Sequence, residues 1–258
     1  MLRSNTVNVG GVVFDNVTMS EALALVEKEI AKGSDRVGSF LCVANQDIIN
    51  RIRTMPELTT DLVNQAFLTI PDGYSIVYAA KYLKTPLKER VTGPDLMDKF
   101  IGVSSEKGYK HFFLGAGAGI AQKMADNFLK KYPQLQISGI YSPPYMKKFS
   151  DEENSKMIKL INDAQPDVLW VSFGCPKQEQ WIIENKGKLK VPVVAGVGAA
   201  FDFFSGNLKR APKFVRDLRL EWLYRLCQEP SRLWRRYFLG GIQFMKIIMA
   251  QKLKKIDF

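Results

Sequence analysis

Asp72 is a residue of this sequence with clear potential for acid–base chemistry. It follows the short apolar run 66–70 and is the middle residue of Pro71-Asp72-Gly73. The run predicts a buried strand, so the carboxylate would lie at the strand's carboxyl end, where parallel sheets bind their ligands. There it could act as a general base toward a hydroxyl group within hydrogen-bonding distance. Asp and Gly are also favoured in turns, and the residues alone favour a plain turn.

Two apolar runs later in the chain, Val168–Phe173 and Val191–Val197, also predict strands, and each leads into a glycine. Neither run alternates apolar with polar residues, which is typical of strands covered on both faces, as in parallel sheets. Because ligands bind beyond the carboxyl ends of such strands, we expect the segments 174–180 and 198–210 to form two sides of one binding crevice.

Polar side chains with binding potential follow the first of these runs. Lys177 could meet a phosphate group, and Gln178 could hydrogen-bond a base or a sugar. Pro176 and Glu179 also suit an ordinary helix start, since proline fits the first turn and a carboxylate favours the positive end of the helix dipole. The two interpretations are compatible, because ligands collect where a helix starts at a strand end.

The glycine-rich stretch Gly115–Gly119 lies between a predicted strand, Lys110–Leu114, and a predicted helix, Ile120–Lys131. Peptide N–H groups and the helix dipole at such a junction can hold a phosphate. The spacing is Gly-x-Gly-x-Gly rather than the full dinucleotide fingerprint, and no acidic residue ends a strand about twenty residues later. A nucleotide-binding module or dehydrogenase is therefore one alternative, and a tight turn with close helix packing is another.

Predicted strands and helices alternate along the chain as far as residue 205. This pattern predicts an α/β fold with a Rossmann-like, doubly wound and mostly parallel sheet. A basic helical appendage is expected after it. Besides the elements already named, the prediction comprises a strand or hairpin arm at 7–14, strands at 39–44 and 136–140, and helices at 21–32 (capped by Thr18 or Ser20), 47–64 (interrupted at Pro56), 76–83, 96 onward, 151–164, 218–236 and 238–255.

The positive charge of the chain is concentrated at its end. The 258 residues carry a net charge of +11, and 207–258, with 13 Lys+Arg against 4 Asp+Glu, contributes +9 of it. Aromatic residues are interleaved with these arginines, which is typical of a helix lying on an anionic membrane surface. Nucleic-acid binding and a solvated face with a buried aromatic side are the alternatives. We predict an α/β core over 1–206 and a basic amphipathic appendage over 207–258.

Several classes of protein do not fit the composition. Three scattered cysteines indicate neither a disulfide framework nor a zinc site and favour a reduced, cytoplasmic setting. No run reaches the roughly 18 apolar residues that span a bilayer, and 1–16 is not typical of a signal peptide. His111, the single histidine, starts a predicted buried strand and is expected to be structural. No tightly bound metal is predicted, and a Ser-His-Asp hydrolase is not expected.

Taken together, the motifs resemble the WecG/TagA/CpsF bacterial glycosyltransferases, glycosyltransferase family 26. The motifs occur in the family's order and cover nearly the whole chain, so the complete set is far more specific than any single motif. The matching motifs are Ile70-Pro71-Asp72-Gly73, Arg90-Val91-Thr92-Gly93-Pro94-Asp95-Leu96, Phe113-Leu114-Gly115, Tyr132-Pro133, Phe173-Gly174-Cys175-Pro176-Lys177-Gln178-Glu179, Gly196-Val197-Gly198, Phe201-Asp202, Gly206, Arg210-Ala211-Pro212, Leu220-Glu221-Trp222-Leu223-Tyr224-Arg225-Leu226, Glu229-Pro230 and Arg232.

The resemblance implies an inverting, metal-independent transferase without a cofactor. It would move an N-acetylhexosamine, a hexose or a uronic acid from a UDP-sugar to a polyprenyl-diphosphate-linked saccharide. The product would belong to teichoic acid, capsule, common antigen or exopolysaccharide. The enzyme would be a cytoplasmic protein held peripherally on the inner face of the cell membrane by 207–258, with no nucleic-acid partner.

The resemblance also assigns roles to individual residues, with Asp72 as the proposed base. The family's Thr-x-Asn motif appears as Val43-Ala44-Asn45, so the asparagine is kept and the threonine hydroxyl is missing. Arginines of the appendage are expected to close over the diphosphate. The residues expected to bind the substrates are Asn45, Arg90, Gly115, Lys177, Gln178, Gly198, Arg210, Arg225 and Arg232.

Overall fold

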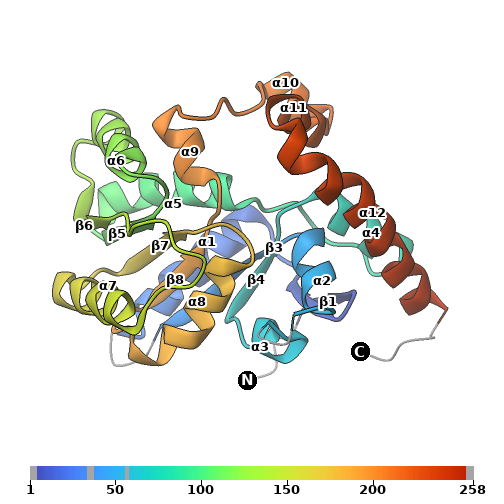
Figure 1. The fold of residues 1–258 in the computed structure, drawn as a ribbon, viewed down its shortest axis with the longest axis horizontal. Coiled ribbons are helices and arrows are strands. Elements are labelled where there is room, and N and C mark those ends of the chain that lie inside the picture. Colours follow the sequence, from blue (N-terminus) through green and yellow to red (C-terminus); the bar gives the residue numbers. More distant parts are fainter. Residues whose placement is uncertain (1–4, 34–37, 56–57, 254–258) are drawn as a thin grey trace.

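The structure is a computed structural model that describes residues 5–33, 38–55 and 58–253. Its centre is a sheet of six parallel strands in the order β4-β3-β8-β7-β5-β6 (Figure 1). A separate antiparallel hairpin, β1 and β2, lies beside it. The predicted α/β fold with a doubly wound parallel sheet is confirmed. The strands are β1 (Thr6–Val9), β2 (Val12–Asp15), β3 (Ser39–Ala44), β4 (Leu68–Pro71), β5 (Lys110–Gly115), β6 (Gln136–Tyr141), β7 (Val168–Ser172) and β8 (Val193–Gly196).

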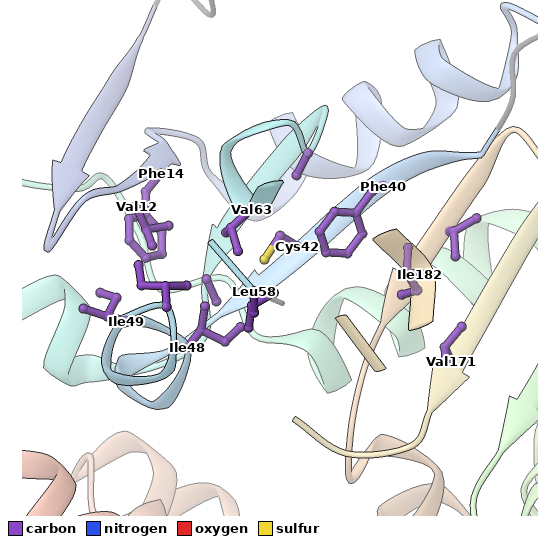
Figure 2. Packing of buried hydrophobic residues seen from close by; sticks show 14 of the residues in the cluster. Val12, Phe14, Phe40, Cys42, Ile48, Ile49, Leu58, Val63, Val171 and Ile182 are labelled. Carbon is purple, nitrogen blue, oxygen red and sulfur yellow. The ribbon is translucent and has the colours of Figure 1, made fainter. Parts of the chain in front are cut away.

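Helices cover both faces of this sheet, because successive residues of a strand point to opposite sides. In β3, Phe40 and Cys42 belong to one buried cluster, and Leu41 and Val43 belong to the other. Figure 2 shows the first cluster, where Phe40 and Cys42 pack near residues of α2, α8 and the hairpin. That face is covered by α2 (Gln46–Arg51), α3 (Thr60–Asn64), α4 (Tyr74–Tyr82), α7 (Asp151–Ala164), α8 (Lys177–Asn185) and part of α12 (Pro230–Lys252), and the opposite face by α1 (Met19–Ile30), α5 (Gly93–Lys107), α6 (Ile120–Lys131) and α9 (Ala200–Ser205).

The register of the strands aligns their carboxyl ends. Ala44 of β3 pairs with Pro71 of β4, and Gly115 of β5 pairs with Ser172 of β7. The segments that follow these strands therefore lie along one edge of the sheet, which we call the carboxyl edge. Five residues singled out in the sequence lie at or just after strand ends on this edge: Asn45, Asp72, Gly115, Gly174 and Gly198.

The end of the chain differs from the prediction of two long helices. α10 (Lys213–Asp217) was not predicted, α11 (Glu221–Gln228) is short, and α12 is one continuous helix. The break falls at Glu229, because Pro230 suits the first turn of a helix and disfavours helical backbone in the residue before it. The prediction of a break near residue 237 was wrong.

α12 returns to the body of the protein and packs along α2. Phe244, Ile247 and Ile248 are buried and join the core cluster of the sheet. Near its end, the Gln251 side chain accepts a hydrogen bond from the Gly10 N–H at 2.8 Å and donates one to the Asn8 carbonyl at 3.0 Å. The appendage is thus fastened to the β1–β2 hairpin. The division into 1–206 and 207–258 stays a prediction.

Other local predictions can be compared directly. Thr18 caps α1 as expected, since its hydroxyl accepts from the Glu21 N–H and its own N–H donates to the Glu21 carboxylate. The segment 47–64 contains α2 and α3, and Pro56 lies outside the described residues. His111 is fully buried and accepts a hydrogen bond from the Trp170 indole at 2.9 Å. Burial lowers its pKa to about 3, so it is neutral and structural, as predicted.

None of the helices in the described part of the chain is both long and apolar enough to cross a membrane.

Candidate active site

Asp72 lies directly after β4, where its backbone N–H continues the sheet by donating to the Ala44 carbonyl at 2.9 Å. Its Oδ1 accepts a hydrogen bond at 3.0 Å from the N–H of Gly93, in the first turn of α5. Burial raises its pKa from 3.8 to about 6, against the effects of the Gly93 hydrogen bond and the charge of Arg90. The carboxylate is therefore fixed in orientation, ionised at neutral pH and basic enough to accept a proton.

Arg90 lies next to this carboxylate and joins it to the appendage. Its guanidinium is centred 4.4 Å above the ring of Tyr74, in the first turn of α4. Its Nη1 donates to Glu221 Oε2 of α11 at 3.2 Å. Both side chains of this ion pair are mostly buried. The pair places the start of α11 beside the end of β4.

Arg210 and Arg216 bring further positive charge to the same place. Arg210 Nη1 donates to Asp95 Oδ1 at 2.7 Å, and its Nε lies 3.5 Å from Glu221 Oε1. Arg216 Nη1 is 3.7 Å from the same Asp95 oxygen. Burial acts to raise the pKa of Asp95, but hydrogen bonds from Arg210 and Thr92 hold it below its ordinary value. Asp95 is therefore an anion that orients arginines from the appendage.

Arg225 completes the group, which we call the arginine cluster: Arg90, Arg210, Arg216 and Arg225. The Arg225 guanidinium lies 5.4 Å from the ring centre of Phe203, and its charge lowers the pKa of Asp72. Among the described residues, Arg210 Nη2, Arg216 Nε and Arg225 Nε are buried without a hydrogen-bond partner. Buried donors of this kind are costly unless something accepts from them. A phosphate or diphosphate would supply the missing acceptors.

Val43 of the neighbouring strand β3, and Asn45 directly after that strand, lie near Asp72. Asn45 caps α2, and its Oδ1 accepts the Asp47 N–H at 2.9 Å. Val43 is buried, and a Cβ added to Gly93 would lie 3.1 Å from it. The residue that replaces the family's threonine thus packs against the glycine whose N–H orients Asp72. Its methyl groups fill that space without a hydrogen-bonding group.

Gln178 and Gly198, both expected to bind the donor, bind each other. Gln178 is buried, its Oε1 accepts the Gly198 N–H at 3.1 Å, and its Nε2 donates to Glu179 Oε1 at 2.7 Å. The Gly198 carbonyl accepts from the Ser172 hydroxyl at 2.7 Å. Gln178 therefore supports the loop after β8, and its amide oxygen and nitrogen are both engaged within the protein.

Gly115 also has a structural explanation. Its φ is +109°, and a Cβ at this position would come within 2.5 Å of the Ser172 carbonyl oxygen. Only glycine fits such a close approach of β5 to the end of β7.

Lys177 and Arg232 have partners outside the arginine cluster. The Lys177 ammonium donates to the Met146 carbonyl and lies 3.7 Å from the ring centre of Phe149. Arg232 is exposed and donates to Glu229 at 2.7 Å. The structure thus brings Asp72 together with Arg90, Arg210 and Arg225, with Asn45 on the adjacent strand. Lys177 is turned toward the loop after β6, and Arg232 lies on the outer surface.

Sequence reasoning missed the carboxylates that organise the cluster, Asp95 and Glu221, and did not single out Arg216 among the appendage arginines expected to close over the diphosphate. Asp95 and Glu221 belong to motifs quoted for the family resemblance, so the signal was present without a role attached. Arg219 was likewise not singled out from the appendage arginines, and its Nη1 donates to the Tyr78 hydroxyl at 2.7 Å. Within the described ranges, no group of three or more His, Cys, Asp or Glu side chains is arranged to hold a metal ion.

Comparison with known proteins identifies the family of the chain. The family profile described as "Glycosyl transferase WecG/TagA/CpsF family" matches residues 7–257. Two relatives named N-acetylglucosaminyldiphosphoundecaprenol N-acetyl-beta-D-mannosaminyltransferase, from Staphylococcus aureus strains MW2 and NCTC 8325 / PS 47, are each 32% identical over 256 residues, which is 98% of this chain and 96% of theirs. The chain therefore belongs to the WecG/TagA/CpsF family of glycosyltransferases.

Proposed function

We propose that this enzyme transfers a sugar from a UDP-sugar to a saccharide carried on polyprenyl diphosphate. The observation that carries the proposal is a fixed carboxylate, Asp72, with a pKa of about 6, beside a cluster of arginines of which three, Arg210, Arg216 and Arg225, each have a buried nitrogen without an acceptor among the described residues. The names of the relatives describe transfer of an N-acetylmannosaminyl group to N-acetylglucosaminyl-diphosphoundecaprenol. An N-acetylhexosamine is therefore the first donor sugar to test, before a hexose or a uronic acid.

The proposed reaction is a single displacement. Asp72 takes the proton from the acceptor hydroxyl as that oxygen attacks the anomeric carbon of the donor sugar. The bond between this carbon and UDP breaks on the opposite face, so the configuration is inverted and UDP leaves with the bonding electrons. Negative charge grows on the diphosphate, where fixed cations stabilise it most effectively. In this proposal Arg90, Arg210 and Arg225 supply those cations.

The appendage would hold this site at a bilayer. Its arginines carry positive charge that an anionic surface attracts, and its helices expose large apolar side chains that could enter the headgroup region. We include peripheral attachment of 207–258 to the membrane in the proposal. These exposed apolar side chains include Phe214, Leu218, Leu220, Trp222, Leu223, Trp234, Leu239 and Leu253.

UDP release tests the proposal, with a panel of UDP-sugars and an N-acetylglucosaminyl-diphosphate lipid as acceptor. Asp72→Asn keeps the oxygen that accepts from Gly93 but cannot take a proton, so kcat should fall by about 10²–10⁴-fold with thermal stability retained. Asp98→Asn, a partly exposed carboxylate of α5 paired with Lys131, is the matched control. Undiminished turnover by Asp72→Asn would remove this residue from the mechanism. Absence of transfer from every UDP-sugar would refute the function.

A further inference from the structure

An open apolar groove runs between α4 and α12, two helices that lie side by side in Figure 1. Its volume of about 660 Å³ is within the range of about 300–1,000 Å³ that is usual for small-ligand sites. Ala79 lies on the α4 side, and Ile242, Met245 and Met249 line it from α12. These three side chains of α12 are exposed. The groove is therefore a channel lined mainly by apolar side chains.

One end of this groove is polar and adjoins the candidate active site. Gln46 and Ser75 line it there. Gln46 follows Asn45 in the chain, and Ser75 lies in the turn of α4 that starts after Asp72-Gly73. The groove thus begins at the carboxyl edge, beside the proposed base.

Positive charge lies at the same end. Tyr78 lines the groove, and its hydroxyl accepts a hydrogen bond at 2.7 Å from Arg219. The Arg219 guanidinium is 5.1 Å from the ring centre of Tyr74, and the Arg90 guanidinium contacts the same ring. The far end is marked by Lys252, whose ammonium donates to the Tyr82 carbonyl at 2.9 Å. Starting from the carboxyl edge, the proposed base comes first, the arginines next and the apolar channel last.

An amphiphile with a hydroxylated sugar, a diphosphate and a hydrocarbon chain has the same order. We propose that the groove between α4 and α12 holds the isoprene units nearest the diphosphate of the lipid-linked acceptor, and that Arg219 binds that diphosphate. This inference rests on the proposed function, because it names the place of that reaction's acceptor. A concave channel with one end near the carboxyl edge suits a single chain better than contact with a bilayer, which would need only an outer apolar surface.

Gly241 offers a way to fill the groove without disturbing the fold. It lines the groove within α12, and a Cβ added to it would have no neighbour within 4 Å. Gly241→Leu therefore places an apolar side chain in the channel, and leucine also favours the helix more than glycine does. Gln243→Leu is the matched control, because Gln243 is exposed on the same helix and does not line the groove.

The test measures equilibrium binding without vesicles or detergent. The probes are geranylgeranyl diphosphate and dimethylallyl diphosphate, which share the headgroup and differ in chain length. The unchanged protein and Gln243→Leu should bind the longer probe at least about tenfold more tightly, and Gly241→Leu should lose this preference. Arg219→Gln should weaken both probes by a similar factor and keep the preference. UDP should bind all four proteins equally.

Two results would overturn the inference. One is a wild-type protein with no preference for chain length in solution; if it binds vesicles nonetheless, the channel is a bilayer contact. The other is a Gly241→Leu variant with the full preference. Failure of the proposed function would look different. A protein that prefers the longer probe but transfers no sugar to the lipid-linked acceptor would support the lipid-binding groove and refute the proposed reaction.

Discussion

Arg90 Nη1 donates a hydrogen bond to Glu221 Oε2 over 3.2 Å, joining residues 131 positions apart in the chain. The bond connects the loop before α5 to the first turn of α11, and the two side chains are only 15% and 17% exposed. Both charges also act on Asp72: Arg90 lowers its pKa, and Glu221 raises it. The ion pair thus links the position of the appendage to the basicity of the proposed catalytic residue.

We expect the two partners of this ion pair to shift the pH–rate profile in opposite directions. The base acts in its ionised form, so the rate should rise as pH increases through the pKa of Asp72, about 6 in the unchanged enzyme. Arg90→Gln should move this rise to higher pH, and Glu221→Gln should move it to lower pH. The measurement is kcat/KM for UDP release across pH. Lys131→Gln, which removes an exposed cation on α6, should leave the profile unchanged. Shifts of both variants in one direction would contradict the electrostatic link.

Lys177 should contribute little to donor binding, although its position in the sequence suggested otherwise. Its ammonium already donates to the Met146 carbonyl and lies over Phe149. Hydrogen bonds to charged groups contribute about 1.5–3 kcal/mol, so loss of a true phosphate ligand should raise the donor KM roughly ten- to hundredfold. Lys177→Met should stay well below that range, whereas Arg225→Gln should reach it. Steady-state kinetics with the UDP-sugar distinguishes the two, and an equal rise for Lys177→Met would restore its predicted role.

The sequence predicted the sheet well because β4, β5, β7 and β8 are largely apolar runs that end at or close to glycine or proline. It could not decide whether Asp72 was a base or a turn residue, since that depends on the register of β3 and β4 and on the N–H of Gly93. It also could not tell that Lys177 turns toward the loop after β6, because a helix start fixes a residue's place and not the direction of a long side chain.

Longer-range features were harder to predict. The break before Pro230 was missed because the apolar and basic pattern of the appendage continues across it. Asp95 and Glu221 were recognised only as members of motifs shared with the family. Their role appears only when the appendage brings Arg210 to both of them.

Glu179 should make the protein less stable at alkaline pH. It is 1% exposed, and within the described part of the chain its Oε2 has no hydrogen-bond partner. Burial raises its pKa from 4.5 to about 7, against the effect of the hydrogen bond from Gln178. As pH rises, Glu179 ionises in the unfolded chain at a lower pH than in the folded protein. The loss of stability therefore begins above the pKa of Glu179 in the unfolded chain and is complete above its pKa in the folded protein. At 1.36 kcal/mol per pKa unit, this cost is about 3 kcal/mol.

Glu179→Gln removes the titration and should therefore increase the free energy of unfolding by about 1–3 kcal/mol at about pH 8, with little change at about pH 4. Urea unfolding at the two pH values measures this. Glu184→Gln, on the same helix but exposed, should change stability by less than about 0.5 kcal/mol at both. Equal stabilisation by Glu179→Gln at both pH values would show that the ionised carboxylate is not the cause.

Attachment of the appendage to membranes can be separated from chemistry by an exposed residue away from both the arginine cluster and the groove. Leu239 of α12 is 56% exposed and does not line the groove. Burying a leucine contributes about 1.5–3 kcal/mol, so Leu239→Glu should weaken binding to anionic vesicles roughly tenfold or more. Turnover of a water-soluble short-chain acceptor should not change.

Leu160→Glu, an exposed leucine of α7, is the control and should bind vesicles normally. Added salt should weaken binding of the unchanged protein, because the net charge of +9 over 207–258 attracts anionic lipid. Equal loss of vesicle binding in both leucine variants would show that the appendage is not the attachment surface.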